Sequence, residues 1–197
     1  IMALDPESEK SELLRELLPT EFSTLCGDRI MIIDAKEEGS SFYFISQSGE
    51  EQEKPAIPIT KRFVEIDCSA DGKKALMTTT HPNKYDLHWL NLEDGSHGES
   101  IIELPLFTRW DLSPDGRHIV AGDTKSRRIF LIDLVTKQQE VLDLPMDHPQ
   151  SFSWAPNGKS FYISGMFGRD STYVLMEVEL EGKQRILREQ SESWMAF

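Results

Sequence analysis

Three pairs of polar residues are the positions of this sequence that could do chemistry. In chain order the pairs are Glu65 with Asp67, Arg109 with Asp111, and Ser151 with Ser153. In each pair a single apolar residue separates the two members, which is the alternation of a half-buried strand. Residues two apart on a strand share one face, so each pair would present two polar groups together.

The carboxylates of these pairs suggest one kind of chemistry. Glu65, Asp67 and Asp111 would supply oxygen ligands of the kind that calcium prefers, and Arg109 would offset part of their charge. A bound cation there could assist hydrolysis. The alternative is that these groups hydrogen-bond neighbouring strands, because buried carboxylates need partners. Both interpretations stay open on the sequence alone.

Familiar catalytic motifs do not accompany the polar pairs. The sequence has no Gly-x-Ser-x-Gly, no His-Glu-x-x-His, no phosphate-binding Walker loop and no Cys-x-x-Cys. The five histidines stand singly, and we expect them on the surface or in loops: His81, His88, His97, His118 and His148. We therefore predict no catalytic residue and no enzymatic activity for the chain.

The elements that must position the pairs are strands joined by a repeated turn. The turn residues are, in chain order, Asp71 and Gly72; Pro114, Asp115 and Gly116; Asn157 and Gly158. Equivalent positions are 44 and 42 residues apart. Proline presets φ for a tight turn, Asp or Asn bonds the nearby backbone, and Gly takes a positive φ. Apolar residues flank each turn, and this pattern predicts a hairpin between antiparallel strands.

A second strand–turn–strand unit follows each copy of this turn, and two more such units come before the first copy. The paired segments are residues 1–5 with 13–17, 42–46 with 56–59, 87–92 with 101–104, 130–134 with 141–144, and 173–180 with 186–188. Four strands per repeat predict an all-β chain, a β-propeller of four-stranded antiparallel blades in a ring of about six to eight. An all-β sandwich is the alternative.

The repeats indicate that the whole chain is one propeller segment made of successive blades. Residues 1–18 would end a blade, residues 191–197 would begin another, and the complete blades would be residues 19–60, 61–104, 105–146 and 147–190. The inner strands of a propeller surround its central channel, so we expect a channel lining made by Glu65, Asp67, Arg109, Asp111 and Ser153.

The composition excludes some classes of partner but does not indicate the cellular compartment of the protein. The net charge of −13 repels phosphate backbones, so we expect no nucleic-acid contact. No apolar run reaches the length of a membrane span. Cys26 and Cys68 stand near matching positions of adjacent repeats, where we expect two buried free thiols; a bridge between blades is the alternative.

The aligned repeats resemble those of TolB-like and WD-repeat-like β-propellers. The likeness rests on Ser-Pro-Asp-Gly-Arg at residues 113–117 and on its variants at 70–73 and 155–159. Residues 85–92, Tyr-Asp-Leu-His-Trp-Leu-Asn-Leu, are similar to the third strand of those blades. The resemblance implies the fold. Such propellers serve as sensor regions of bacterial regulators and kinases, in the Tol–Pal envelope system, and beside prolyl-oligopeptidase-like hydrolase domains.

The resemblance favours a non-enzymatic binding module, the sensor or scaffold part of a larger bacterial protein. Its partner would be a protein or peptide, docking through the loops at residues 81–84 and 166–170. The alternative function is an accessory propeller of a prolyl-oligopeptidase-like serine peptidase. Periplasm and cytoplasm both remain open as the compartment.

Overall fold

The structure is a computed structural model of the 197-residue chain. The described residues are 2–4, 11–13, 16–36, 39–46, 57–59, 63–106, 108–123, 125–167 and 172–190. All regular structure among them is β-strand. This part of the chain contains no helix that is long and apolar enough to cross a membrane.

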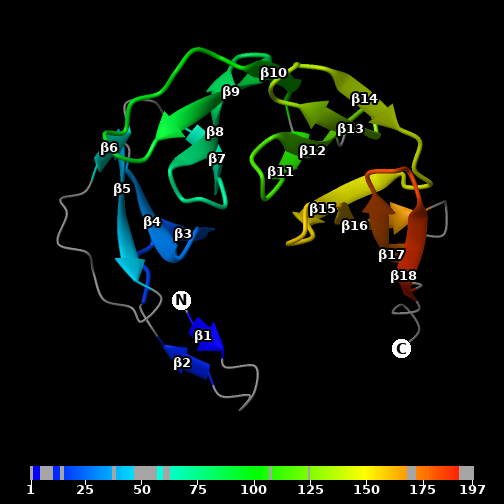
Figure 1. Cartoon of the computed structure of the whole chain (residues 1–197), viewed down its shortest axis with the longest axis horizontal. Helices are drawn as coiled ribbons and strands as arrows, with labels where there is room; N and C mark the ends of the chain where they lie inside the picture. The colour runs from blue at the N-terminus through cyan, green and yellow to red at the C-terminus, as the bar shows by residue number, and fades with distance from the viewer. Residues whose placement is uncertain are drawn as a thin grey trace. The chain divides into compact units, whose positions relative to one another are not determined.

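The chain divides into two compact units. The first comprises Ile1–Thr80 with Asp86–Ser100, and the second comprises His81–Tyr85 with Ile101–Phe197. The chain forms antiparallel sheets whose strands follow one another in the sequence. Figure 1 shows these strands with the labels used below.

The chain begins with a short pair of antiparallel strands, β1 (Met2–Leu4) and β2 (Ser11–Leu13). Two four-stranded sheets come next in the sequence. The first sheet has the order β3 (Glu21–Cys26), β4 (Arg29–Lys36), β5 (Gly39–Ser46) and β6 (Ile57–Ile59). The second contains β7 (Phe63–Cys68), β8 (Lys74–His81), β9 (Lys84–Asn91) and β10 (Ile102–Pro105). Every strand pairs with its sequence neighbour, which is the arrangement of a propeller blade.

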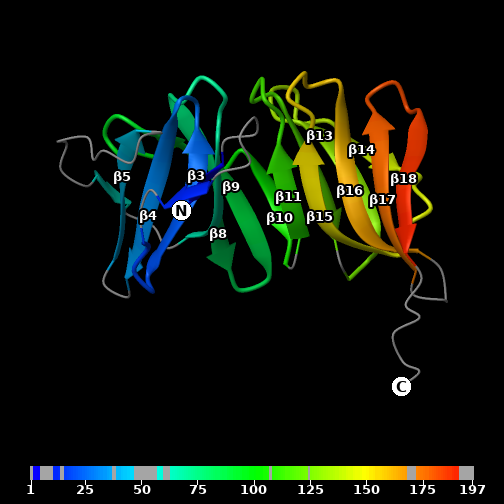
Figure 2. The ribbon, with the colours of Figure 1, turned by 90° about the horizontal axis from the view of Figure 1, so that it is seen from below.

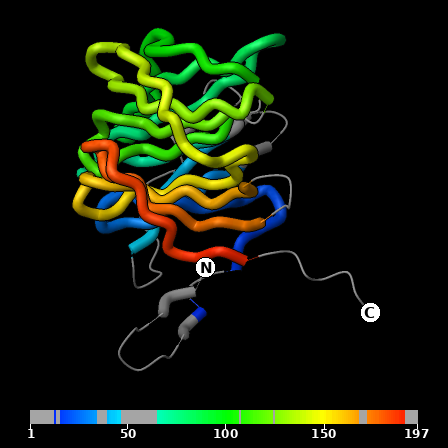
Figure 3. Tube along the Cα trace, turned by 90° about the vertical axis from the view of Figure 1, so that its right-hand side faces the viewer, coloured from blue at the N-terminus to red at the C-terminus, as the bar shows by residue number. Residues whose placement is uncertain are grey.

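The third and fourth sheets repeat this order. The third contains β11 (Thr108–Leu112), β12 (His118–Asp123), β13 (Arg128–Asp133) and β14 (Gln139–Leu142). The fourth contains β15 (His148–Trp154), β16 (Ser160–Phe167), β17 (Thr172–Glu179) and β18 (Gln184–Gln190). Figure 2 shows β11 beside β15, and Figure 3 shows β18, in red, on the outside of its sheet.

One backbone hydrogen bond recurs in three sheets and fixes the position of the second hairpin. Leu92 donates its N–H to the carbonyl of Lys73, Leu134 to that of Arg117, and Leu180 to that of Lys159. Each donor follows the third strand of its sheet and each acceptor lies just after the repeated turn. The turn therefore anchors both hairpins of a sheet.

The expected strand over residues 13–17 is wrong in extent. The strand β2 ends at Leu13, and residues 16–18 form no strand. A turn through Pro19 comes next: Glu21 donates its N–H to the Leu18 carbonyl at 2.9 Å, and its carboxylate accepts the Leu18 N–H. These bonds engage the backbone groups that a longer strand would have offered to a neighbour.

Each unit has its own hydrophobic core between two sheets. In the first unit Met31, Ile33 and Phe42 of one sheet pack with Ala75 and Met77 of the next. In the second unit the buried residues come from both sheets: Val120, Ile129, Trp154, Phe161, Ile163, Val174, Met176 and Val178. A four-stranded sheet cannot bury both faces alone, so these shared cores hold neighbouring blades together.

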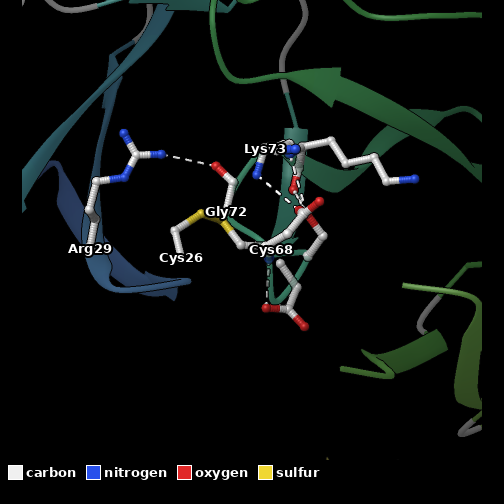
Figure 4. Close-up of a disulfide and its surroundings, with 9 residues drawn as sticks. Cys26, Arg29, Cys68, Gly72 and Lys73 are labelled. Atoms are coloured by element: carbon white, nitrogen blue, oxygen red, sulfur yellow. Dashed lines mark hydrogen bonds between the residues drawn. A yellow bond between two sulfur atoms is a disulfide. The ribbon is translucent and has the colours of Figure 1, made fainter. Parts of the chain in front are cut away.

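The two cysteines are bonded to each other, so the expected pair of free thiols is wrong. Cys26 ends β3 and Cys68 ends β7; their Cα atoms are 5.1 Å apart, and 42 residues separate them in sequence. Figure 4 shows this disulfide beside the Arg29 guanidinium, which donates to the Gly72 carbonyl at 2.9 Å. Both contacts join the first sheet to the second.

The backbones of the two sheets approach closely at this point. Gly27 and Gly72 both have a φ of +63°, which disfavours any residue with a side chain. A Cβ on Gly72 would lie 3.0 Å from the Cys26 carbonyl oxygen. Glycine at these turns therefore lets the two inner strands come near enough for the cysteines to bond.

We predict that breaking the disulfide lowers the free energy of unfolding by about 2–4 kcal/mol, because the closed loop of 42 residues restricts the unfolded chain. Urea unfolding of the native chain with and without dithiothreitol measures this loss. A Cys26→Ser/Cys68→Ser variant should start at the lower stability and ignore the reductant. Two free thiols in the untreated native chain would contradict the prediction.

Candidate functional site

The repeated turn residues lie in tight turns that close the first hairpin of their sheets. Asp71 and Asp115 each accept the hydroxyl of the serine two residues earlier, Ser69 at 2.7 Å and Ser113 at 2.5 Å. Gly72, Gly116 and Gly158 have positive φ values between 63° and 67°. In the fourth sheet Asn157 accepts the Lys159 N–H at 2.9 Å, and Pro114 immediately precedes the third-sheet Asp.

These bonds change the acidity of the turn carboxyls. The Ser69 hydroxyl and the Lys73 N–H lower the pKa of Asp71 from its ordinary value. Burial opposes ionisation of Asp115, but the bonds from Ser113 and Arg117 lower its pKa below the ordinary value. Both groups are therefore charged hydrogen-bond acceptors at neutral pH, and a general acid would need the opposite shift. The hydrogen bonds to these two carboxylates stabilise the turns.

Asp111 holds the third sheet to the fourth. Its Oδ2 atom accepts the backbone N–H of Trp154 at 2.7 Å, and its backbone carbonyl accepts the indole Nε1–H of the same residue at 3.1 Å. Both bonds span 43 residues, which is one repeat. Of the two interpretations open on the sequence, the structural one describes Asp111: a half-buried carboxylate with a partner on the neighbouring sheet.

The other residues of the expected channel lining lie at half-buried or exposed positions. Asp67 accepts the N–H of Cys68 at 2.8 Å and is half-buried, as is Glu65. Arg109 and Ser153 are exposed on β11 and β15. The structure thus places Glu65 with Asp67 in the first unit, and Arg109, Asp111 and Ser153 in the second.

Nothing in the described part of the chain supports the calcium hypothesis. Within the ranges given above, no three or more His, Cys, Asp or Glu side chains lie together in a group that could hold a metal ion. The proposed carboxylate ligands Asp67 and Asp111 instead accept N–H groups of the protein. Calcium therefore remains a prediction without structural support.

One histidine departs from the expectation of surface or loop positions. His88 lies on β9 and is 3% exposed. Its Nδ1 atom lies 3.0 Å from the Gly98 carbonyl and its Nε2 atom 3.1 Å from the Thr79 hydroxyl. Because a carbonyl only accepts, Nδ1 carries the proton in this arrangement. The ring therefore ties the end of the sheet to the segment that follows β9.

A charged cluster that the sequence did not single out lies where the β11–β12 turn meets the end of β13. Asp133 accepts two bonds from the Arg117 guanidinium, at 2.9 and 3.0 Å, and the N–H groups of Val135 and Thr136. The Thr136 bond is the main cause that lowers the pKa of Asp133 to about 2. No local sequence pattern predicts this cluster, since Arg117 and Asp133 are 16 residues apart. Its hydrogen bonds hold the β11–β12 turn against the β13–β14 turn.

The two loops expected to bind a partner are only partly described. Residues 81–84 form an exposed turn between β8 and β9, where Lys84 forms an ion pair with Glu103. Of residues 166–170, the last three lie outside the described residues, and Phe167 is 42% exposed.

The chain was compared with known proteins at three levels. No protein-family model matches it, and no curated protein sequence matches it. Among solved structures, TolB from Acinetobacter baumannii has a TM-score of 0.70 at 14% identity, over 96% of this chain. A protein assigned as TolB from Agrobacterium tumefaciens has a TM-score of 0.70 at 15% identity, over 95% of this chain and 68% of its own. The chain has a TolB-like β-propeller fold.

The TolB-like chain spans 49% of the length of the Acinetobacter protein. It is also similar to the tricorn protease, with a TM-score of 0.61 at 12% identity, over 97% of this chain and 20% of the protease. Identities this low establish the fold alone, and a fold of this kind serves many functions. The function must therefore be argued from the residues.

We predict that Asp111→Ala lowers the free energy of unfolding by about 1–3 kcal/mol, because the Trp154 N–H then loses its acceptor in a buried place. Asp111→Asn keeps an oxygen at that position and should recover most of the loss. Urea unfolding followed by tryptophan fluorescence measures the change. Equal stability of Asp111→Ala and the exposed control Glu99→Ala would refute the role given to Asp111.

Proposed function

We propose that this TolB-like propeller is a non-enzymatic module that binds a protein or peptide partner, as the sensor or scaffold part of a larger bacterial protein. One observation carries the proposal: the carboxylates that could act in catalysis or bind a cation form hydrogen bonds within the scaffold. Asp111 joins two sheets, and Asp71 and Asp115 hold turns. The repeated polar residues therefore serve the scaffold, and the parts that differ between blades are left for recognition.

The disulfide supports a compartment for this function. Structural disulfides form and persist in oxidising environments, which in bacteria means the periplasm or the outside of the cell. The bond between Cys26 and Cys68 joins two sheets of one unit. We therefore favour the periplasm over the cytoplasm as the place where the module acts.

The similarity to one fifth of the tricorn protease supports a second candidate, a propeller attached to a peptidase. In that case the chain would accompany a hydrolase domain and the partner would be a peptide substrate. The two candidates differ in outcome. A scaffold retains its partner unchanged, whereas a peptidase complex cleaves it.

The test is affinity capture by the immobilised whole chain from an extract of the source cells, followed by titration with the purified captured protein. We expect saturable binding of an uncleaved protein, weakened about tenfold by His81→Ala with Asn83→Ala in the exposed β8–β9 turn. Glu93→Gln with Glu99→Gln, at exposed positions after β9, is the matched control and should leave the affinity unchanged.

Two results would contradict the proposal. One is that the folded chain retains no more protein than a heat-unfolded sample. The other is that the chain alone hydrolyses peptide or ester substrates, which would make it an enzyme.

A further inference from the structure

The second unit has a groove between its two sheets, at their outer strands. It has a volume of about 320 Å³ and lies between the β13–β14 side of the third sheet and the β16–β17 side of the fourth. We call it the outer groove. Figure 1 shows the β17–β18 turn beside the segment after β14, where the Gln184 side chain donates to the Asp143 carbonyl at 3.1 Å. This bond links the two walls, so the groove is formed in the free chain.

The floor of the outer groove is apolar. Leu131 and Leu142 contribute from the third sheet, and Phe161 and Val178 from the fourth. Phe161 and Val178 belong to the buried core, against which Leu131 and Leu142 pack while partly exposed. An aliphatic side chain placed here would extend the core of the unit, and each Å² of apolar area it removes from water contributes about 25 cal/mol.

The rim of the outer groove is acidic. Among the described residues that line it are four carboxylates and no lysine or arginine: Glu140, Asp143, Glu179 and Glu181. Lys183 lies nearby, 3.6 Å from Glu179 and 3.8 Å from Glu181, with a side chain 73% exposed. One lysine does not balance four carboxylates, so the rim attracts cations.

The negative charge of the rim determines which class of partner can bind in the outer groove. The whole chain carries −13, so a second copy, a nucleic acid and an anionic lipid surface all meet repulsion at this rim. A lysine- or arginine-bearing partner meets attraction, which raises its rate of encounter and fixes its orientation. The volume accommodates a few side chains and no folded domain.

The strand at the edge of the groove favours an extended occupant. β14 is the outermost strand of its sheet, and its side chains Gln139, Glu140 and Val141 are exposed. An outermost strand offers backbone N–H and C=O groups to a further strand, and peptides commonly bind in this way. A strand laid along β14 would direct alternate side chains to the floor and to water.

We propose that the outer groove binds an extended cationic peptide segment, in which an aliphatic side chain enters the floor between lysine or arginine residues that meet the rim. The proposal rests on the binding function proposed above and names the chemistry of its partner. It adds a contact with that partner at the outer strands of the second unit, beside the contact expected at the β8–β9 turn.

The first experiment measures the fluorescence anisotropy of labelled heptapeptides titrated with the whole chain. An alternating Leu-Lys peptide should bind saturably and more weakly as salt rises. Two other peptides separate the contributions: Ser-Lys keeps the charge without the aliphatic side chain, and Leu-Glu reverses the charge. Both should bind at least about tenfold more weakly. No binding of Leu-Lys, or equal binding of Ser-Lys, overturns the proposal.

The second experiment locates the site. Glu140→Gln with Glu181→Gln removes two rim charges from exposed side chains and should weaken Leu-Lys binding about three- to tenfold. Glu93→Gln with Glu99→Gln removes two exposed charges from the first unit, so it is the matched control for general attraction to an acidic protein. An equal effect of both variants overturns the proposal.

The captured partner separates this proposal from the binding function itself. If Glu140→Gln with Glu181→Gln still binds the partner at full affinity, the groove proposal fails and the binding function stands. If the unchanged chain binds no partner and no peptide, both fail. If the rim variant weakens binding of the partner and of the Leu-Lys peptide alike, the groove is one of the contacts that recognise the partner.

Discussion

Within each unit, adjacent sheets are joined at their innermost strands or the turns beside them at intervals of one repeat, and the rest of the unit depends on these links. In the second unit Asp111 accepts the N–H of Trp154, 43 residues away. In the first unit Cys26 and Cys68 are bonded across 42 residues, and Arg29 reaches the Gly72 carbonyl across 43. Hydrogen bonds and a covalent bond thus serve the same purpose. They keep two sheets in contact so that each covers an apolar face of the other.

This constraint explains which polar residues were available for function. A side chain that can bind a cation can also accept an N–H group from the next sheet, and in Asp111 the second use is observed. The repeated Asp residues of the turns are similarly engaged by serine hydroxyls. Recognition is therefore sought where the blades differ, as at the acidic rim between β14 and the β17–β18 turn. The inner strands maintain the shape that brings those outer residues together.

The fold was largely predictable because its signals are local. Proline, Asp or Asn, and Gly at fixed steps define a turn such as that at Asp115 without reference to the rest of the chain, and alternation defines the strands beside it. The strand expected over residues 13–17 followed from the repeat and not from its own residues, and it ends at Leu13, a few residues before the turn through Pro19. The contacts between sheets were harder to predict, since they depend on distances in space. Matching positions of Cys26 and Cys68 in adjacent repeats were the one signal of a bridge. The contact of His88 with the Gly98 carbonyl, ten residues away, had no comparable signal.

The central claim is that neighbouring sheets of a unit are held together at their inner strands. Amide hydrogen exchange, measured on the native chain with the disulfide intact and after reduction, tests it most directly. The account predicts that reduction speeds exchange in β3 and β7 together while the amides of β15 and β16, in the other unit, keep their rates. Unchanged exchange in β3 and β7, or an equal increase in all sheets, would contradict it.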